Sequence, residues 1–396
     1  MSPRFSHVFQ FGQRWLNWLN RQPPNTVRPV VMETMVKIMA CGTSLMGWSI
    51  WRCPDPECNH EKRVKFTCKS RSCPHCGVKA CLQWINNTLA WLPEAPWQHI
   101  TFTMPCEYWP VIRANRWLLG EMNRLAADVV LTICRDLNIT PGIFTAIHTW
   151  GRDQKWHPHI HLSTTAGGVT KNNTWRDISF YRENVMTMWR HRITKLLRKH
   201  YYTLTIPDEL KCEGRSKFSW NHLLNTHYKR GWNINLSDIL SNITHVTLYL
   251  GFYLKKPPVS LSRLKHYAGE DNITLRYKSH RTKKQEEEVM TSDELITRFE
   301  SHVPEKWFHM IRYYGFLSPS APMRKMLTEV VYPLIQQDKK SAKKITFRNM
   351  YRHVFKVDPL VCLLCGKKLL FAGMNFGLKL KALMARHDDL ARLRWQ

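Results

Sequence analysis

Acidic residues are scarce in this chain of 396 residues, which has 30 Asp and Glu against 59 Lys and Arg. With so few carboxylates and no compelling cluster of them, a metal-dependent nuclease built on three acidic residues is disfavoured. No run of about 18 apolar residues occurs, so no membrane-spanning helix is expected. The start, Met-Ser-Pro-Arg-Phe-Ser, also has no apolar segment of signal-peptide length. We therefore expect a cytoplasmic protein.

The excess of basic residues leaves a formal net charge of +29, and these residues are spread along the chain. A dispersed excess of this size favours a polyanionic partner bound over a broad surface, with nucleic acid as the leading candidate. The chain also has 17 Trp. Aromatic rings among cations can stack on unpaired bases, although most of these rings are expected in the core.

Most of the 12 cysteines lie at or before Cys81 or form the pair Cys362 and Cys365. In a reducing compartment such clustering indicates metal binding rather than disulfides. Cys73 and Cys76, followed by Gly77, have the spacing of a zinc knuckle. Cys53 and Cys58 form a second pair upstream. Two such pairs predict a four-thiolate zinc site, which is structural because the protein fills every position.

A second zinc ion has enough candidate ligands, although their spacing is irregular: Cys41, His60, Cys68 and Cys81. Cys362-x-x-Cys365 resembles half of a further knuckle, and no partner pair follows it. Basic residues throughout the Cys-rich segment favour DNA contact as its role. They are Lys62, Arg63, Lys65, Lys69 and Arg71.

Hydrophobic periodicity predicts helices at 8–19, 30–39, 111–137, 181–199, 236–256 and 292–301. Alternating segments predict strands at 99–104, 143–150, 156–165, 273–277 and 286–290. The second and third of these form a hairpin, and Gly167-Gly168 is expected to end it. Residues 207–235 are expected to form an insertion or a DNA-facing loop region. The preponderance of strands over parallel crossovers favours an α+β fold with an antiparallel sheet.

The motif His157-Pro-His-Ile-His161 lies in one of these strands. Side chains alternate along a strand, so His157, His159 and His161 are expected on one face, where imidazoles can share a divalent ion. About ninety positions later, Tyr249 and Tyr253 lie four residues apart in a segment of helical pattern. A metal ion and two phenol groups suggest DNA strand cleavage and rejoining.

A phenol has a pKa near ~10, so it needs a cationic neighbourhood to act as a nucleophile. Lys255 and Lys256 follow the tyrosines, and His245 precedes Tyr249 by one turn. For a Tyr-x-x-x-Tyr pair taken alone, core packing would be the simpler interpretation. The histidine motif favours the catalytic one.

Taken together, these motifs resemble transposases of the IS91 group, the two-tyrosine members of the HUH endonucleases. The resemblance rests on four stretches besides the histidine motif: Cys68-Lys-Ser-Arg-Ser-Cys-Pro-His-Cys-Gly77, Gln98-His-Ile-Thr-Phe-Thr-Met-Pro105, Tyr249-Leu-Gly-Phe-Tyr-Leu-Lys-Lys-Pro257 and Arg312-Tyr-Tyr-Gly-Phe-Leu317. It implies an antiparallel HUH-type sheet with the histidines on an inner strand, preceded by a small zinc-binding module.

The resemblance implies that His159 and His161 bind the metal and that Tyr249 and Tyr253 are the nucleophiles. The third metal ligand is not given by the motif. His157 is favoured by strand geometry, with His245 and Gln154 as rivals. The implied cofactors are Mg²⁺ or Mn²⁺ for catalysis and Zn²⁺ for structure. The implied partners are single-stranded DNA at transposon ends, target DNA and host replication factors, at the bacterial nucleoid.

The expected division of the chain is an N-terminal zinc-binding module (1–92), a catalytic domain (93–320) and a basic C-terminal region (321–396). Two tyrosines would permit two sequential strand transfers in a rolling-circle route. A plasmid replication initiator or a relaxase would share this chemistry, but the Cys-rich module ahead of the histidines favours a transposase. A zinc-dependent DNA-binding protein without catalysis is the alternative from another class.

Overall fold

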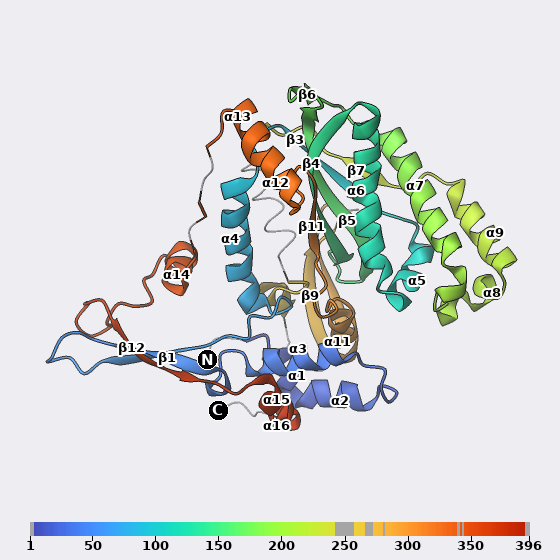
Figure 1. The fold of residues 1–396 in the computed structure, drawn as a ribbon. Coiled ribbons are helices and arrows are strands. Elements are labelled where there is room, and N and C mark those ends of the chain that lie inside the picture. Colours follow the sequence, from blue (N-terminus) through green and yellow to red (C-terminus); the bar gives the residue numbers. More distant parts are fainter. Residues whose placement is uncertain are drawn as a thin grey trace.

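The computed structural model describes residues 4–241, 257–265, 272–279, 282–338, 341–342 and 344–392. Within them the chain is built around a six-stranded sheet whose pairings are all antiparallel (Figure 1). Its strands, in spatial order, are β11 (Ile311–Gly315), β4 (Ile139–Trp150), β5 (Trp156–Thr170), β3 (Trp97–Phe102) and β7 (Ile234–Leu236), with β6 (Trp175–Asp177) on β5. The expected α+β class with an antiparallel sheet is confirmed.

Helices cover both faces of this sheet, and alternation along the strands supplies a core to each. On β4, Ile143 and Ile147 face one core, while Phe144 and Ala146 face the other. The first core is covered by α5 (Trp109–Ala114), α6 (Leu118–Asp136), α7 (Arg182–Lys199) and α9 (Lys217–Tyr228), and the short α8 (Lys211–Gly214) precedes α9. The second is covered by α4 (Pro74–Trp91), α12 (Ala321–Met326), the π-helical segment Leu327–Val331 and α13 (Tyr332–Leu334). Figure 1 shows α4 and α6 on opposite sides of the sheet.

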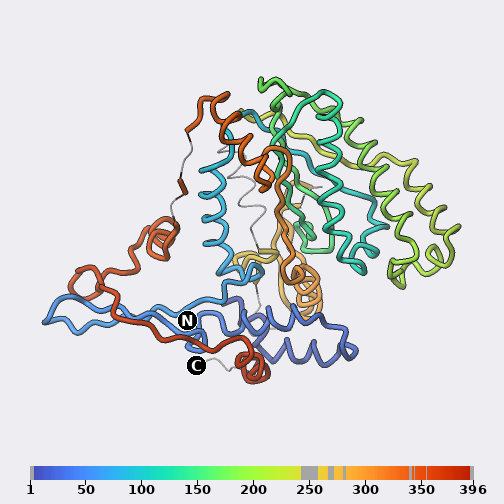
Figure 2. Tube along the Cα trace, viewed as in Figure 1, coloured from blue at the N-terminus to red at the C-terminus, as the bar shows by residue number. Residues whose placement is uncertain are grey.

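A second body lies below the sheet in Figure 2 and combines segments that are distant in sequence. Its helices are α1 (His7–Gln10), α2 (Arg14–Asn20), α3 (Pro29–Ala40), α11 (Ser292–Ser301), α15 (Leu380–Met384) and α16 (His387–Arg392). A sheet of β8 (Leu264–Lys265), β9 (Asn272–Lys278) and β10 (Gln285–Thr291) packs with them in one core. This core draws on all three predicted domains, whose boundaries stay a prediction.

A third sheet projects from this body. It has the order β12 (Leu370–Phe376), β1 (Gly47–Arg52) and β2 (Glu61–Lys65), so a C-terminal strand pairs with the N-terminal hairpin. Helix α14 (Phe347–Phe355) precedes β12. Within the described ranges, none of the helices combines the length and apolar character that a bilayer crossing requires.

Local structure departs from the sequence-based expectations at several places. The helix expected at 8–19 is interrupted, because Gly12 and Gln13 have φ values of +55° and +54° between α1 and α2. The helix expected at 236–256 does not begin at its predicted start, because Leu236 ends β7 and the described residues after it, 237–241, are not helical. The single helix expected at 111–137 is two helices, because Asn115 leaves the helical conformation and exchanges hydrogen bonds of 2.8 Å with the backbone of Thr205. Residues 207–235 are not mainly loop, since they contain α8 and α9. Strand β5 continues through Gly168, where a Cβ atom would lie 2.3 Å from Thr140 O.

Candidate functional site

Three buried histidines meet on the face of the sheet that α4 covers. In the antiparallel ladder His148 on β4 pairs with His159 on β5, and His161 lies two residues further along β5. One ligand nitrogen from each residue lies within 4.8 Å of the others. His148 is only 1% exposed, and His159 and His161 are each 6% exposed. This group can hold a divalent ion with three imidazoles.

Outer hydrogen bonds orient two of these rings. His159 Nδ1 donates to His157 O at 2.8 Å, which leaves Nε2 as the ligand atom. His161 Nδ1 lies 3.0 Å from His99 Nε2, and His99 Nδ1 lies 3.1 Å from Ser163 Oγ. The Nε2 atoms of His159 and His161 then face each other at 3.1 Å. Such outer partners are what a metal-binding imidazole requires.

Burial keeps the imidazoles of His148 and His161 neutral. It lowers the pKa of His148 and of His161 well below the usual value, and the neighbouring histidines lower both further. Burial also lowers the pKa of His99 to about 4. A neutral imidazole is the form that binds a metal ion, so the donor set fits a divalent cation at neutral pH.

The third histidine of the group is His148 and not the predicted His157. The His157 ring packs on Trp109, with ring centroids 4.5 Å apart, and it lies outside the group of converging ligand atoms. The rival Gln154 donates from Nε2 to Pro258 O at 3.4 Å, and His245 lies outside the described residues. Strand alternation within β5 alone could not reveal a ligand from β4.

A cation from the Cys-rich segment also acts on this group. Arg71 lies in the loop between Cys68 and Cys73, and its charge contributes to lowering the pKa of His148. Burial lowers the pKa of Arg71 itself to about 10. A partly buried guanidinium near neutral imidazoles is suited to meeting a phosphate.

The candidate nucleophiles Tyr249 and Tyr253, with Lys255 and Lys256, lie outside the described residues. The residues that follow them are described. A Cβ atom on Gly77 would lie 2.4 Å from Pro257 Cγ, so the first turn of α4 packs directly against Pro257. Pro258 accepts the hydrogen bond from Gln154 on the β4–β5 hairpin.

One four-cysteine group joins the start of α4 to the end of α3. It consists of Cys41, Cys68, Cys73 and Cys76. The Sγ atoms lie 3.5 Å apart in Cys68 and Cys76, 3.7 Å apart in Cys41 and Cys76, and 4.0 Å apart in Cys41 and Cys73. Four sulfurs at ~2.3 Å from a tetrahedral zinc ion lie about 3.8 Å apart. The group therefore fits a structural zinc ion.

The predicted pairing of the cysteines is corrected by this arrangement. Cys53 and Cys58 are not grouped with Cys73 and Cys76, because the β1–β2 hairpin carries them away from α4. They lie beside Cys362 and Cys365, the pair for which the sequence offered no partner. The predicted second set also separates: Cys41 and Cys68 join the first group, His60 Nδ1 lies 3.1 Å from Cys362 Sγ, and Cys81 is in neither group.

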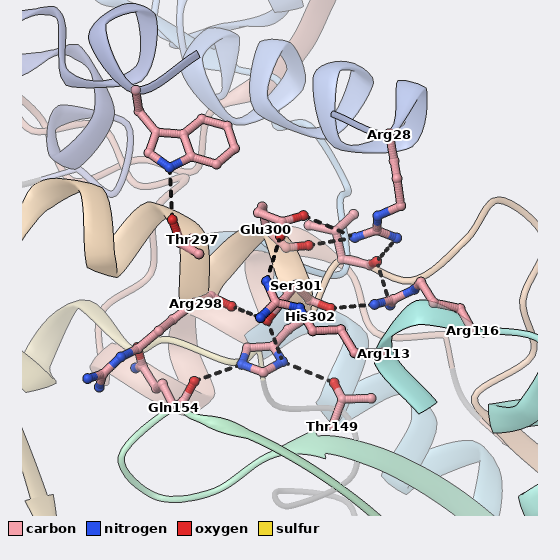
Figure 3. A network of polar contacts seen from close by, with 12 residues as sticks. Arg28, Arg113, Arg116, Thr149, Gln154, Thr297, Arg298, Glu300, Ser301 and His302 are labelled. Atoms are coloured by element: carbon pink, nitrogen blue, oxygen red, sulfur yellow. Dashed lines mark hydrogen bonds and ion pairs between the residues drawn. The ribbon is translucent and has the colours of Figure 1, made fainter. Parts of the chain in front are cut away.

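A buried polar network fixes the β4–β5 hairpin against α11 (Figure 3). His302 Nε2 donates to Gln154 O at 2.9 Å, so its Nδ1 accepts from Thr149 Oγ1 at 3.1 Å. Arg116 donates to Ser301 O at 2.7 Å. Burial lowers the pKa of His302 to about 3. Apart from Gln154, which was a rival metal ligand, none of these residues stood out in the sequence, because their partners lie far along the chain.

Comparisons with known proteins agree over the whole chain. A family described as "Putative transposase" matches residues 142–325, and one described as "Transposase zinc-binding domain" matches residues 10–104. The transposase for insertion sequence element IS801 of Pseudomonas savastanoi pv. phaseolicola is 36% identical over 404 residues, which cover 100% of this chain and 97% of that protein. "Putative transposase y4qJ" of Sinorhizobium fredii is 29% identical over 298 residues, 72% of this chain and 74% of that protein. No solved structure gives a significant match.

Proposed function

Because the chain belongs to the IS91 family of transposases, we propose that it cleaves and rejoins single-stranded DNA through 5′-phosphotyrosine intermediates. The observation that carries the proposal is the buried group of His148, His159 and His161, whose ligand atoms converge on one face of the sheet. The substrates are transposon ends and target DNA, exchanged by a rolling-circle route. The coarser conclusion, an enzyme acting on DNA, follows from the family itself.

These three imidazoles would hold the catalytic divalent ion, Mg²⁺ or Mn²⁺. Such an ion, when bound, polarises the scissile phosphate and neutralises charge on its oxygens. His99 and the carbonyl of His157 keep His161 and His159 oriented toward the shared position. Arg71, partly buried and close enough to lower the pKa of His148, would supply a further positive charge to the phosphate.

Tyr249 and Tyr253 are the proposed nucleophiles, and the contacts of Pro257 and Pro258 support this assignment. The two prolines follow the tyrosine segment directly. Pro257 lies against α4, whose first turn carries part of the zinc group, and Pro258 is hydrogen-bonded to the β4–β5 hairpin, whose strands carry the histidines. A phenol that has lost its proton attacks phosphorus, forms the phosphotyrosine bond and releases the 3′ oxygen, which takes up a proton. Lys255 and Lys256 would favour the phenolate.

The Cys41, Cys68, Cys73 and Cys76 group is proposed to hold a structural zinc ion in place of the set predicted from spacing. Its role is to position the basic loop that contains Arg71 beside the histidines, and to contact DNA. Host replication factors and the nucleoid are the proposed cellular context.

The test uses wild type, Tyr249→Phe, Tyr253→Phe and the double variant, each incubated with Mn²⁺ and single-stranded DNA that spans the ends of the element. A denaturing gel then shows whether protein stays attached to DNA. We expect a metal-dependent adduct with wild type and none with the double variant. Binding to the true ends without any adduct would instead support the non-catalytic zinc protein, and cleavage confined to a plasmid origin would support a replication initiator or relaxase.

A further inference from the structure

We propose that Cys53, Cys58, Cys362 and Cys365 bind a second structural zinc ion, which clamps the C-terminal segment onto the N-terminal β1–β2 hairpin. The two pairs come from opposite ends of the chain, and Cys362 lies 304 positions after Cys58. The zinc-binding family match ends at residue 104 and so includes only the first pair.

The four sulfurs have the geometry of a metal site. Cys53 Sγ lies 3.3 Å from Cys365 Sγ, and Cys58 Sγ lies 3.6 Å from Cys362 Sγ. All four lie within 4.8 Å of one another. These separations are close to the ~3.8 Å expected around tetrahedral zinc and far above the ~2.05 Å of a disulfide.

Each pair is held in a backbone turn that brings its two thiols together. Around the first pair, Cys58 N donates to Asp55 O and Cys53 N donates to His60 O, both at 3.0 Å. In the second turn, Cys362 N donates to Lys367 O at 2.8 Å and Gly366 N donates to Cys362 O at 3.0 Å.

Gly366 directly follows Cys365 and has a φ of +73°, a conformation that disfavours residues with a side chain. In the first group a glycine, Gly77, also follows the last cysteine, although it lies within α4. Lys367 forms an ion pair of 2.8 Å with Asp55, which joins the two turns across the cluster.

Apolar packing accounts for only part of this cluster, since Cys362 is buried but its partner is not. Cys365 is exposed, and the intervening Leu363 and Leu364 are 81% and 76% exposed. Strand β12, which follows the second pair, leaves most of its side chains exposed, among them Phe376 at 80%. A peripheral sheet with so little buried apolar surface needs another source of stability, which a bound metal ion supplies.

The experiment measures zinc in the purified full-length chain by plasma mass spectrometry. We expect about two zinc ions per chain in wild type and about one in Cys362→Ser/Cys365→Ser. The control Cys106→Ser/Cys212→Ser removes two exposed cysteines that lie outside both groups, and should keep two. One zinc ion in wild type, or two retained in Cys362→Ser/Cys365→Ser, would overturn the proposal.

Cobalt substitution covers the case in which the serine variant does not fold. Cys365→His keeps four ligands but replaces one thiolate, so the thiolate-to-cobalt absorption should weaken and shift relative to wild type. An unchanged cobalt spectrum would show that Cys365 does not bind the metal. Both readouts are independent of DNA cleavage, so they can fail or succeed separately from the tyrosine chemistry.

Discussion

His148 on β4 lies directly opposite His159 on β5, with ring centroids 5.4 Å apart. Residues that pair across antiparallel strands project from the same face, so the third imidazole of the site comes from the neighbouring strand. His148→Ala should therefore reduce formation of the DNA adduct by about 100-fold or more, as loss of a metal ligand does. His157→Ala should retain most of the activity, since its ring packs on Trp109. The yield of the DNA adduct, measured for both variants over a range of Mn²⁺ concentrations, tests this. A lower yield for His157→Ala than for His148→Ala would contradict it.

His99 should act on the metal through His161, whose Nδ1 lies 3.0 Å from His99 Nε2. His99→Phe keeps a ring of similar shape but removes the hydrogen bond. Loss of such a partner weakens metal affinity by ~10–100-fold, and excess Mn²⁺ should rescue cleavage. The Mn²⁺ concentration for half-maximal adduct yield measures this. An unshifted half-maximum would show that His161 does not depend on His99.

Arg71→Gln should lower the rate of cleavage by ~10–100-fold, because a partly buried cation near the histidines is lost. Zinc content should stay unchanged, since no cysteine is altered. Lys69→Gln is the matched control, because it removes a charge from an exposed residue of the same loop. Single-turnover rates with saturating DNA separate cleavage from binding. Equal rates for the two variants would argue against a role for Arg71 at the phosphate.

Gly77→Ala should displace Pro257, because the new methyl carbon would lie 2.4 Å from the proline ring. We expect a loss of ~1–3 kcal/mol in the free energy of unfolding, typical of overpacking, together with reduced cleavage. Gly231→Ala is the control, since no heavy atom would lie within 4 Å of its Cβ. Chemical denaturation and adduct yields compare the variants. If the Gly77→Ala variant had the stability and the adduct yield of wild type, α4 would not pack against Pro257.

The stability of the chain should fall on acidification partly through His302. Its pKa is lowered by burial to about 3 in the folded protein, while an unfolded histidine binds a proton below pH ~6.5. The neutral ring therefore stabilises the fold fully above pH ~6.5, and this contribution declines toward pH 3. Between pH 7 and pH 5 the loss is about 2 kcal/mol.

Urea unfolding at the two pH values measures this loss. His302→Asn should show a smaller pH dependence than wild type, and substitution of the exposed His309 by Asn should not. If the free energy of unfolding depended on pH equally in all three proteins, His302 would not be the source of that dependence.

Elements whose signals are local could be predicted from the sequence. The 181–199 and 292–301 helices appear as α7 and α11, and the 143–165 hairpin appears as β4 and β5, because the spacing of apolar residues and the turn residues act within one segment. The motifs were sufficient to indicate the IS91 family, which the full-length match to the IS801 transposase confirmed. His159 and His161 could also be predicted as metal ligands from a local signal, since alternation along one strand places both on the same face.

Only the tertiary structure decided which distant residues share a site. His148 joins the histidines through strand register, which depends on pairing between β4 and β5 and leaves no mark in the spacing of one strand. Cys53 and Cys58 meet Cys362 and Cys365 because β12 pairs with β1 across most of the chain length. Spacing predicted that the cysteines form pairs, since each pair lies in one turn. Which pairs combine depends on long-range packing, and the sequence by itself contains no local signal for that.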